Sequence, residues 1–262
     1  MSLASLDGHI GPAEEARIPV TDEGLLRGDG AFEVMRLYGG RPFALRDHLD
    51  RLRRSAEGLR LEADHDALEG ELSALLEANG AADALLRVVI TRGGRRIAII
   101  EPLPERPQTA RVATITYAPG RILDGLKTLS YAGNMLAGRL AKERGFDEGL
   151  LTSPHGRVLE GPTWTFFWVE GGKLFTPPLE DRILSSITRA RLLEECDVSL
   201  CSCTLDDIRA AEEAFIASTV REVMPIAVVD DIELPSAPGP VTLDAHARFQ
   251  ARVERELAAA PA

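Results

Sequence analysis

The sequence predicts an α+β fold built from two domains. Segments with the alternation or apolar character of strands occur in both halves of the chain, and the helical stripes are grouped between them. A doubly wound parallel sheet would need a helix after almost every strand, and the sequence lacks that alternation. At 262 residues, 45% of them hydrophobic, the chain is long enough for two cores of ordinary size. We therefore expect an N-terminal domain over residues 1–117, a connector over 118–126 and a C-terminal domain over 127–262.

The N-terminal half begins with an expected strand, turn and strand over residues 18–38, with Gly28-Asp29-Gly30 in the turn. Gly39-Gly40 then permits the positive φ angles of a tight turn that closes a hairpin. Apolar residues at 45, 49, 52, 56 and 59 form one stripe of a helix, and a second helix over 65–79 ends at Asn79-Gly80. The strands that complete this half are expected over 83–93, 95–103 and 110–118.

The C-terminal half follows a stretch without period at 118–125, which we interpret as the connector. The helices of this half are expected over 135–145, from about Ser186 to 196, and over 243–257. The strands are expected over 148–153, 156–161, 165–178, 212–218 and 223–230. In a further strand over 198–205, Cys201 and Cys203 are two residues apart, so we expect both thiols on one buried face.

The composition argues against several classes of protein. A net charge of −11 disfavours a protein that binds nucleic acid or anionic membranes, because both functions need a positive surface. No apolar run approaches the ~20 residues that span a bilayer, and the first residues lack the basic start and apolar stretch of a secretory signal. Three cysteines without a CxxC pair fit reduced thiols rather than a metal site. We therefore expect a cytoplasmic protein with no nucleic-acid, membrane or metal partner.

The lysines are few, which makes their positions informative. Only three of the 30 lysine and arginine residues are lysines. Lys142 lies near an expected helix end, where a solvated cation is favourable, and Lys173 follows two glycines in an expected turn. Lys127 differs, because its segment ILDGLKTLSYAGNML has no pattern of surface charge. We therefore single out Lys127 as a candidate for chemistry.

Five segments together resemble the fold-type IV pyridoxal-phosphate enzymes, the class IV aminotransferases. In chain order they are DEGLLRGDGAFEVMRLYGGRPFALRDHLDRL, KTLSYAGNMLA, DEGLLTSPHGRVLEG, ILSSITR and FIASTVREVMPI. The resemblance runs from about Ile18 to Ile232, nearly the whole chain. The family includes D-amino-acid, branched-chain and (R)-amine transaminases and aminodeoxychorismate lyases. The resemblance implies a two-domain type IV fold and pyridoxal 5′-phosphate as the cofactor.

The resemblance assigns the two central roles of the chemistry to Lys127 and Glu160. A lysine amine holds the cofactor covalently and moves a proton once the substrate has taken its place. Lys127 falls on that lysine. Glu160 falls on the carboxylate that the family pairs with the pyridine nitrogen, where a negative charge favours the protonated ring.

The resemblance also assigns a phosphate site. Ile187 and Thr188 open a helix, whose backbone N–H groups and positive dipole end suit an anion. Arg51, in HLDRL, can bind two phosphate oxygens with its planar fork. Ser218 and Thr219, before the last strand, add hydroxyl donors.

One stretch departs from the family pattern. After Glu160 the family is rich in serine and ends in asparagine, whereas this chain has GPTWTF. Thr163 or Thr165 is a candidate to replace the lost donor, and the sequence does not decide which. Trp164 is expected to pack between sheets, as strand aromatics usually do.

The expected substrate contacts include two unusual arginines. Arg27 and Arg87 stand where branched-chain enzymes carry tyrosines, and the Arg-x-His carboxylate trap of familiar D-amino-acid enzymes is absent after TRG. Arginines suit a substrate carboxylate, although both side chains would do nothing if they pointed outward. Arg36, Phe32 and Val34 complete the expected substrate-binding residues. In the family the GDG loop reaches the partner subunit's site, so the resemblance implies that Arg27 acts across a homodimer interface.

We expect a transaminase that moves an amino group between an amino acid, with D-amino acids favoured, and a 2-oxo acid. The alternatives are a branched-chain amino-acid transaminase and an aminodeoxychorismate lyase. Val34 weakens the resemblance to the lyases, because some lyases carry a threonine at this position. A non-catalytic pyridoxal-phosphate carrier would have no need of Lys127 and Glu160.

Overall fold

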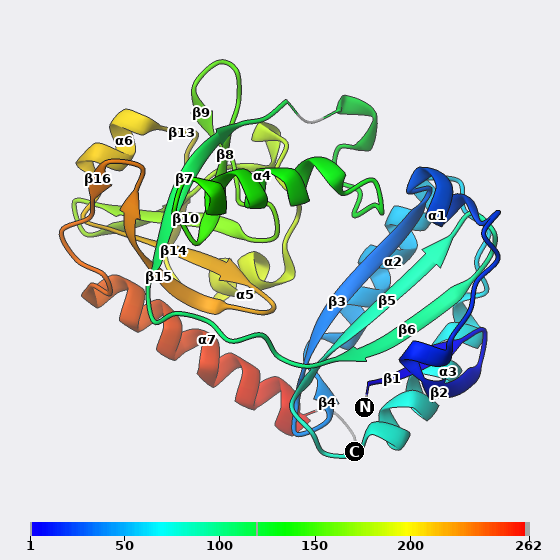
Figure 1. Cartoon of the computed structure of the whole chain (residues 1–262). Helices are drawn as coiled ribbons and strands as arrows, with labels where there is room; N and C mark the ends of the chain where they lie inside the picture. The colour runs from blue at the N-terminus through cyan, green and yellow to red at the C-terminus, as the bar shows by residue number, and fades with distance from the viewer. Residues whose placement is uncertain (1, 119, 260–262) are drawn as a thin grey trace. The chain divides into compact units, whose positions relative to one another are not determined.

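The computed structural model describes residues 2–118 and 120–259 of the chain (Figure 1). Within these ranges the chain forms two compact units. The first unit comprises the described residues up to Pro104 together with Leu126–Tyr131. The second comprises Glu105–Gly125 and the described residues from Ala132 onward. The expected α+β fold class is confirmed, and each unit has a sheet of its own.

The units divide the chain at different residues from those that the sequence predicts. Strand β7 (Ala110–Thr116) belongs to the second unit, because it pairs in parallel with β8 (Glu148–Thr152) and β15 (Glu222–Val229). Leu126–Tyr131 belongs to the first unit, where its backbone pairs with the sheet. The expected boundary after residue 117 and the expected connector 118–126 are therefore displaced by strand pairing, which no local pattern reveals. Pro119 of that connector lies outside the described residues.

The first unit contains a six-stranded sheet in the order β2-β1-β6-β5-β3-β4. Its strands are β1 (Leu3–Leu6), β2 (His9–Pro12), β3 (Gly30–Tyr38), β4 (Arg41–Pro42), β5 (Ala84–Thr91) and β6 (Arg96–Glu101). All the neighbouring strands of this sheet are antiparallel. Val34 of β3 lies opposite Arg87 of β5, and Arg87 lies opposite Ile99 of β6. Because side chains alternate along a strand, this register decides which residues share a face.

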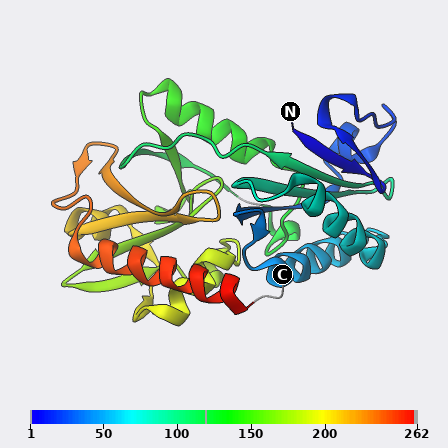
Figure 2. The same ribbon diagram turned by 90° about the horizontal axis from the view of Figure 1, so that it is seen from below.

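Two helices, α2 (Leu45–Gly58) and α3 (His65–Asn79), cover one face of this sheet (Figures 1 and 2). We call it the helix face, and it buries an apolar cluster that includes Met35, Leu52 and Leu72. The expected helical stripe is thus confirmed, with Leu52 and Ala56 at its centre. The opposite face carries Phe32, Val34 and Arg36 of β3, Arg87 of β5 and Glu101 of β6. The unit also has the short helices η1 (Ala13–Glu15) and α1 (Glu23–Arg27).

The second unit contains a ten-stranded sheet in the order β12-β11-β10-β14-β15-β7-β8-β9-β13, with β16 beside β15. Its other strands are β9 (Arg157–Val158), β10 (Thr165–Glu170), β11 (Lys173–Thr176), β12 (Val198–Leu200), β13 (Cys203–Thr204), β14 (Glu213–Ser218) and β16 (Ile232–Glu233). Its helices are η2 (Arg121–Leu123), α4 (Ala132–Glu143), η3 (Leu179–Asp181), α5 (Ile187–Glu195), α6 (Leu205–Ala210) and α7 (Pro240–Ala259).

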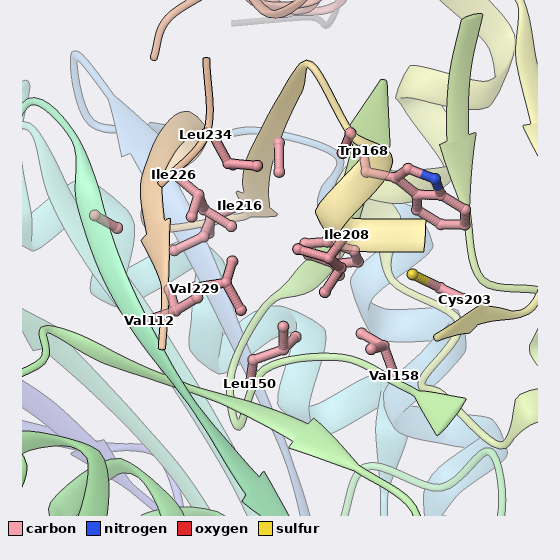
Figure 3. Close-up of a cluster of buried hydrophobic side chains, with 14 of the residues drawn as sticks. Val112, Leu150, Val158, Trp168, Cys203, Ile208, Ile216, Ile226, Val229 and Leu234 are labelled. Carbon is pink, nitrogen blue, oxygen red and sulfur yellow. The ribbon is translucent and has the colours of Figure 1, made fainter. Parts of the chain in front are cut away.

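Side chains from distant strands of this sheet pack into one core (Figure 3). Val112, Leu150 and Ile216 point toward one another from β7, β8 and β14. Ile208 of α6 closes the same cluster. Helices α5 and α7 lie against β14, and α7 also runs along β15 (Figure 2). This packing fixes the strand ends from which the candidate site residues of the second unit project.

Two sequence predictions are wrong in detail. The strand expected at 18–20 does not form, and the chain instead enters helix α1, while the hairpin β1–β2 near the N-terminus was not predicted. The expected strand over 198–205 is broken, because β12 ends at Leu200 and β13 begins at Cys203. As a result Cys201 is exposed and Cys203 is buried, rather than both lying on one buried face. None of the described helices combines the length and apolar character needed to cross a bilayer.

Candidate active site

The backbone of Lys127 is held on two sides within the first unit. The carbonyl of Lys127 accepts a hydrogen bond from the Phe32 N–H at 3.1 Å, and the Leu129 N–H donates to the Gly30 carbonyl at 2.8 Å. The segment therefore lies antiparallel to the start of β3. From the helix face, the Ser55 hydroxyl of α2 accepts from the Lys127 N–H at 3.0 Å. These bonds fix the Cα position from which the lysine side chain extends.

The turn before β3 has glycines where it meets the lysine segment. Gly28 has a φ of 67°, in the left-handed region, and a Cβ there would lie 3.1 Å from the Leu129 carbonyl oxygen. A Cβ on Gly30 would lie 2.5 Å from the Ile90 carbonyl oxygen and 2.6 Å from the Leu129 side chain. The Ser130 hydroxyl also donates to the Gly28 carbonyl at 3.2 Å. The close approach of the two segments thus requires glycine at both positions.

The amine of Lys127 lies beside two aromatic rings. Its Nζ is 4.4 Å from the centroid of Phe32 and 5.6 Å from that of Tyr131. The two rings meet edge to face, with centroids 5.2 Å apart and planes at 80°. Lys127 is half-buried, whereas Lys142 and Lys173 are exposed. The structure thus separates Lys127 from the other two lysines, as its sequence context predicts.

A buried polar cluster lies under the lysine segment on the helix face. Glu33 of β3 receives two bonds from Arg51 of α2, one from Nε at 2.6 Å and one from Nη2 at 2.7 Å. His48 of α2 bonds the same carboxylate through Nδ1 at 2.8 Å. The exposed fractions of the Arg51 and Glu33 side chains are 7% and 0%. No role was expected for Glu33 or His48, although both lie in the first of the five family-like segments and the alternation of β3 turns residue 33 inward.

Within this cluster, charge pairing favours an ionised Glu33 and burial favours a neutral His48. Burial would raise the pKa of Glu33, but the charge and hydrogen bonds of Arg51, with His48, lower it to about 2. Burial lowers the pKa of His48. Because an ionised carboxylate can only accept, the proton in the His48–Glu33 bond belongs to Nδ1. Arg51, a candidate phosphate ligand, is thereby held side-on, through Nε and Nη2, by a permanent counter-charge.

On the opposite face of the sheet, Arg87 pairs with Glu101. Its Nε donates to Oε1 at 2.7 Å and its Nη2 donates to Oε2 at 2.9 Å. The guanidinium carbon of Arg87 is 5.8 Å from the centroid of the Phe32 ring. Phe32 therefore has the guanidinium of Arg87 and the amine of Lys127 as its two cationic neighbours. Glu101 is a second acid that sequence reasoning missed, because its pairing depends on the register of β5 and β6.

The other expected substrate residues lie at different places in the first unit. Val34 lies on the same face as Phe32, opposite Arg87, and is half-buried. Arg36 follows on that face, with its guanidinium carbon 4.6 Å from the centroid of Tyr38. Arg27 lies at the surface of the first unit, with 66% of its side chain exposed, and pairs with Glu23 one turn away on α1. Arg87 and Phe32 are thus brought together with Lys127 within the first unit.

In the second unit, Glu160 lies between β9 and β10, and its side chain contacts the segment that leads into α5. Its Oε1 accepts a hydrogen bond from the Leu184 N–H at 3.0 Å, and its carbonyl accepts from the Leu151 N–H at 2.8 Å. Burial and the charge of Glu160 raise the pKa of Tyr117. Burial lowers the pKa of Arg189 against the opposing charge of Glu160. The Glu160 carboxylate is therefore held in place, and its charge acts on the pKa values of Tyr117 and Arg189.

Helix α5 begins where the sequence predicts. Ser186 is its N-cap, and the Ser186 hydroxyl accepts from the Arg189 N–H at 3.3 Å. Ile187 and Thr188 are the first two helical residues, and both are buried. Their backbone N–H groups belong to the first turn, where no carbonyl of the same helix can accept from them. This helix start has the character of an anion site.

The remaining candidates of the second unit lie in two turns. Ser218 ends β14, and its hydroxyl accepts from the Arg221 N–H at 3.0 Å, while Thr219 follows in the turn. The Thr163 hydroxyl accepts from Nη1 of Arg221 at 3.3 Å. Thr165 is buried within β10. Trp164 is buried in the sheet core, as expected for a packing residue.

Each unit, taken by itself, has donors that match parts of one kind of cofactor. The first supplies a primary amine and an oriented arginine, and the second supplies a carboxylate, a helix start and hydroxyls. Pyridoxal 5′-phosphate presents a matching aldehyde, pyridine nitrogen and phosphate. Among the described residues no group of histidine, cysteine and acidic side chains is placed to hold a metal ion. Each unit therefore carries donors of the kinds that this cofactor needs.

Comparison with known proteins identifies the family. The family model for amino-transferase class IV matches residues 30–229, and the chain belongs to this family of pyridoxal-phosphate-dependent enzymes. A D-alanine aminotransferase of Bacillus licheniformis is 29% identical, over 96% of this chain and 97% of that protein. An aminodeoxychorismate lyase of Bacillus subtilis is 28% identical, over 90% of each. The crystal structure of the branched-chain aminotransferase of Thermoproteus uzoniensis with norvaline is 30% identical, with a TM-score of 0.88 over 97% of this chain and 95% of that chain.

Proposed function

We propose that this aminotransferase acts on amino acids, with D-amino acids favoured, and on the corresponding 2-oxo acids. One observation carries the proposal: the guanidinium of Arg87 and the amine of Lys127 are both neighbours of the Phe32 ring. An α-amino acid carries its carboxylate and its amino group on one carbon, so it needs a cation close to the reacting amine. A simple amine would have no use for Arg87 there.

The cofactor contacts that we propose follow the donor set. Lys127 holds pyridoxal 5′-phosphate covalently, and Glu160 pairs with the pyridine nitrogen. Arg51, Ile187, Thr188, Ser218 and Thr219 hold the phosphate through a guanidinium, backbone N–H groups and hydroxyls. When bound, the cofactor supplies an electron sink for the carbon that loses its proton. The permanent pairing of Arg51 with Glu33 supports its place as a fixed rather than a mobile ligand.

Lys127 is also the proposed acid–base group. When it is not bonded to the cofactor, the Lys127 amine would take a proton from the substrate carbon and return it elsewhere. The backbone hydrogen bonds of Lys127 to Phe32 and Ser55 keep its amine within reach of the substrate carbon throughout. The positive charge that it gains lies beside the faces of Phe32 and Tyr131.

We further propose a cytoplasmic homodimer. Helix α1 carries Arg27 together with Leu25 and Leu26, each of which has 58% of its surface exposed. Exposed leucines beside a cation are typical of a surface that another subunit covers. This supports a role of Arg27 toward the substrate of the partner subunit. Three cysteines that form no disulfide support the reducing environment of the cytoplasm.

The second candidate is the elimination of pyruvate from aminodeoxychorismate. It is favoured by the relative of that name from Bacillus subtilis. Val34, half-buried opposite Arg87, offers no hydroxyl on this face. The two reactions differ in what they consume, because transamination needs a 2-oxo acid over many turnovers and elimination does not.

A panel of D- and L-amino acids tests the proposal directly. The holoenzyme is mixed with each amino acid, without a 2-oxo acid, and its cofactor absorption is followed. We expect D-amino acids to convert the absorption band faster than their L-enantiomers, and amines without a carboxylate to react most slowly. Faster conversion by L-leucine or L-isoleucine would replace the D-specific assignment with a branched-chain one. Repeated turnover of aminodeoxychorismate without a 2-oxo acid would favour the lyase.

A further inference from the structure

Two aromatic residues of the first unit lie beside the amine of Lys127: Phe32, which the sequence analysis places among the substrate-binding residues, and Tyr131, to which no role is assigned above. Phe32 is buried in β3, with only 6% of its surface exposed, and Tyr131 ends the lysine segment four residues after Lys127. Nζ lies 4.4 Å from the centroid of Phe32 and 5.6 Å from that of Tyr131. Both distances fall within the ~6 Å over which a ring face attracts an ammonium group.

The rings also hold each other. They pack edge to face at 5.2 Å and 80°, the arrangement in which the positive edge of one ring meets the negative face of its neighbour. Phe32 is further fixed by the hydrogen bond of its N–H to the Lys127 carbonyl, at 3.1 Å. The ring faces are therefore held where the end of the lysine side chain lies.

This arrangement answers a problem of the proposed chemistry. A lysine side chain has four rotatable carbons, and its amine leaves the cofactor in every cycle. It must stay near the reacting carbon, take up one proton to become an ammonium, and give that proton back. Rings that attract the ammonium restrict the side chain and stabilise its charged form, and the only titratable group that these two rings add is the Tyr131 hydroxyl.

We propose that Phe32 and Tyr131 form an aromatic clamp that holds the Lys127 ammonium whenever this amine is not bonded to the cofactor. The clamp is a positioning device, and it rests on the proposed role of Lys127. The charged groups around it within the first unit are Glu33, His48 and Arg51 on the helix face and the Arg87–Glu101 pair beside Phe32. All of them stay unchanged in the variants below.

The scarcity of lysine makes the clamp measurable. The full-length chain, freed of cofactor, is labelled over a range of pH with an amine reagent, and each lysine peptide is quantified by mass spectrometry. Because the chain has only three lysines, the exposed Lys142 and Lys173 serve as internal references. The holoenzyme is labelled in parallel, where Lys127 should be protected.

The variants are Phe32→Leu and Tyr131→Leu, which remove a ring but keep apolar bulk. Tyr131→Phe keeps the ring, and Phe43→Leu removes a buried ring of the same unit, which lies in the turn after β4 and meets Tyr38 edge to face. For Phe32→Leu we expect the pH of half-maximal Lys127 labelling to fall by about 0.7–1.5 units, a fivefold to thirtyfold change. The shift should be smaller for Tyr131→Leu and absent in both controls.

The outcomes separate the clamp from the function on which it rests. Unchanged midpoints in Phe32→Leu and Tyr131→Leu, with native circular dichroism, would overturn the clamp. An equal shift in Phe43→Leu would also overturn it, since a general loosening of the sheet would then explain the result. Failure of the holoenzyme to protect Lys127 would instead refute the assignment of Lys127 to the cofactor. If Phe32→Leu does not fold, Tyr131→Leu against Tyr131→Phe gives the same decision.

Discussion

Two arginine–glutamate pairs lie on opposite faces of the first sheet with nearly the same geometry. Arg51 binds Glu33 through Nε and Nη2 at 2.6 and 2.7 Å, and Arg87 binds Glu101 through the same atoms at 2.7 and 2.9 Å. The exposed fractions are 7% and 0% for the first pair and 34% and 30% for the second. The two pairs therefore differ in burial and in the additional bond that His48 makes to Glu33. If one side chain of the Arg51–Glu33 pair is removed, water cannot solvate the charge that is left. The Arg87–Glu101 pair, in contrast, is accessible to water and to a ligand.

The largest difference should appear when one acid is removed. Glu33→Gln leaves the Arg51 charge buried without its counter-charge, so we expect a loss of about 3–5 kcal/mol in the free energy of unfolding. The matched variant Glu101→Gln should lose no more than about 1 kcal/mol, because water can solvate Arg87. Urea unfolding of both variants measures the two losses. Equal losses would mean that burial does not distinguish the pairs.

Acid should weaken the buried pair within a defined window. The pKa of Glu33 is lowered from 4.5 to about 2 in the folded chain, and the unfolded chain binds the proton near the ordinary value. The stabilisation is therefore complete above about pH 5 and is lost as the pH falls from about 4.5 through 2. The difference in unfolding free energy between the wild type and Glu33→Gln should narrow by about 3 kcal/mol over that range. A difference that stays constant down to pH 2 would contradict the lowered pKa.

Arg87 should matter for substrates rather than for folding. In the proposed role, Arg87→Ala removes a charged hydrogen bond to the substrate carboxylate, and such a loss typically costs about 1.5–3 kcal/mol, or tenfold to more than a hundredfold in KM. The KM values for amino acids and 2-oxo acids should rise together, while the cofactor absorption stays unchanged. A primary amine without a carboxylate is the control substrate. The same loss on that amine would exclude a carboxylate contact.

The smallest effect concerns salt. A double-mutant cycle on Arg87 and Glu101 should give a coupling of less than about 1 kcal/mol that fades between low and 1 M ionic strength, where the screening length falls to ~3 Å. The same cycle on Arg51 and Glu33 should change little, because ions do not reach a buried pair. Unfolding in different salt concentrations measures both couplings. A salt-resistant Arg87–Glu101 coupling would show that this pair is shielded as well.

The sequence predicts the local parts of this molecule better than the pairings. The start of α5 at Ser186 and the stripe of α2 follow from capping and helical periodicity, which depend on neighbouring residues. The isolated context of Lys127 likewise lies within one segment. Glu33 and Glu101 were missed because each pairs with a residue brought close by tertiary packing or strand register. The place of β7 in the second sheet depends on the same kind of information.

Arg51 shows that a local motif can predict a residue without predicting its partner. The motif HLDRL singles out the residue, but nothing in the motif tells that a carboxylate 18 positions earlier holds its guanidinium. Cys201 shows the reverse case, in which alternation was sufficient for a strand but a two-residue break put the thiol on the surface. Periodicity therefore describes an element only as long as the element is continuous.

Gly28 and Gly30 have no functional group, yet the lysine segment Leu126–Tyr131 can pack against the start of β3 only because these positions lack a side chain. A methyl group at either position would push against Leu129 or its backbone, two residues from Lys127. In a survey of every single substitution, these two positions should therefore be as intolerant as the lysine itself. A scan scored only by enzyme activity would rank them among the catalytic residues. Scored by the yield of folded protein, Lys127 would tolerate change and the two glycines would not.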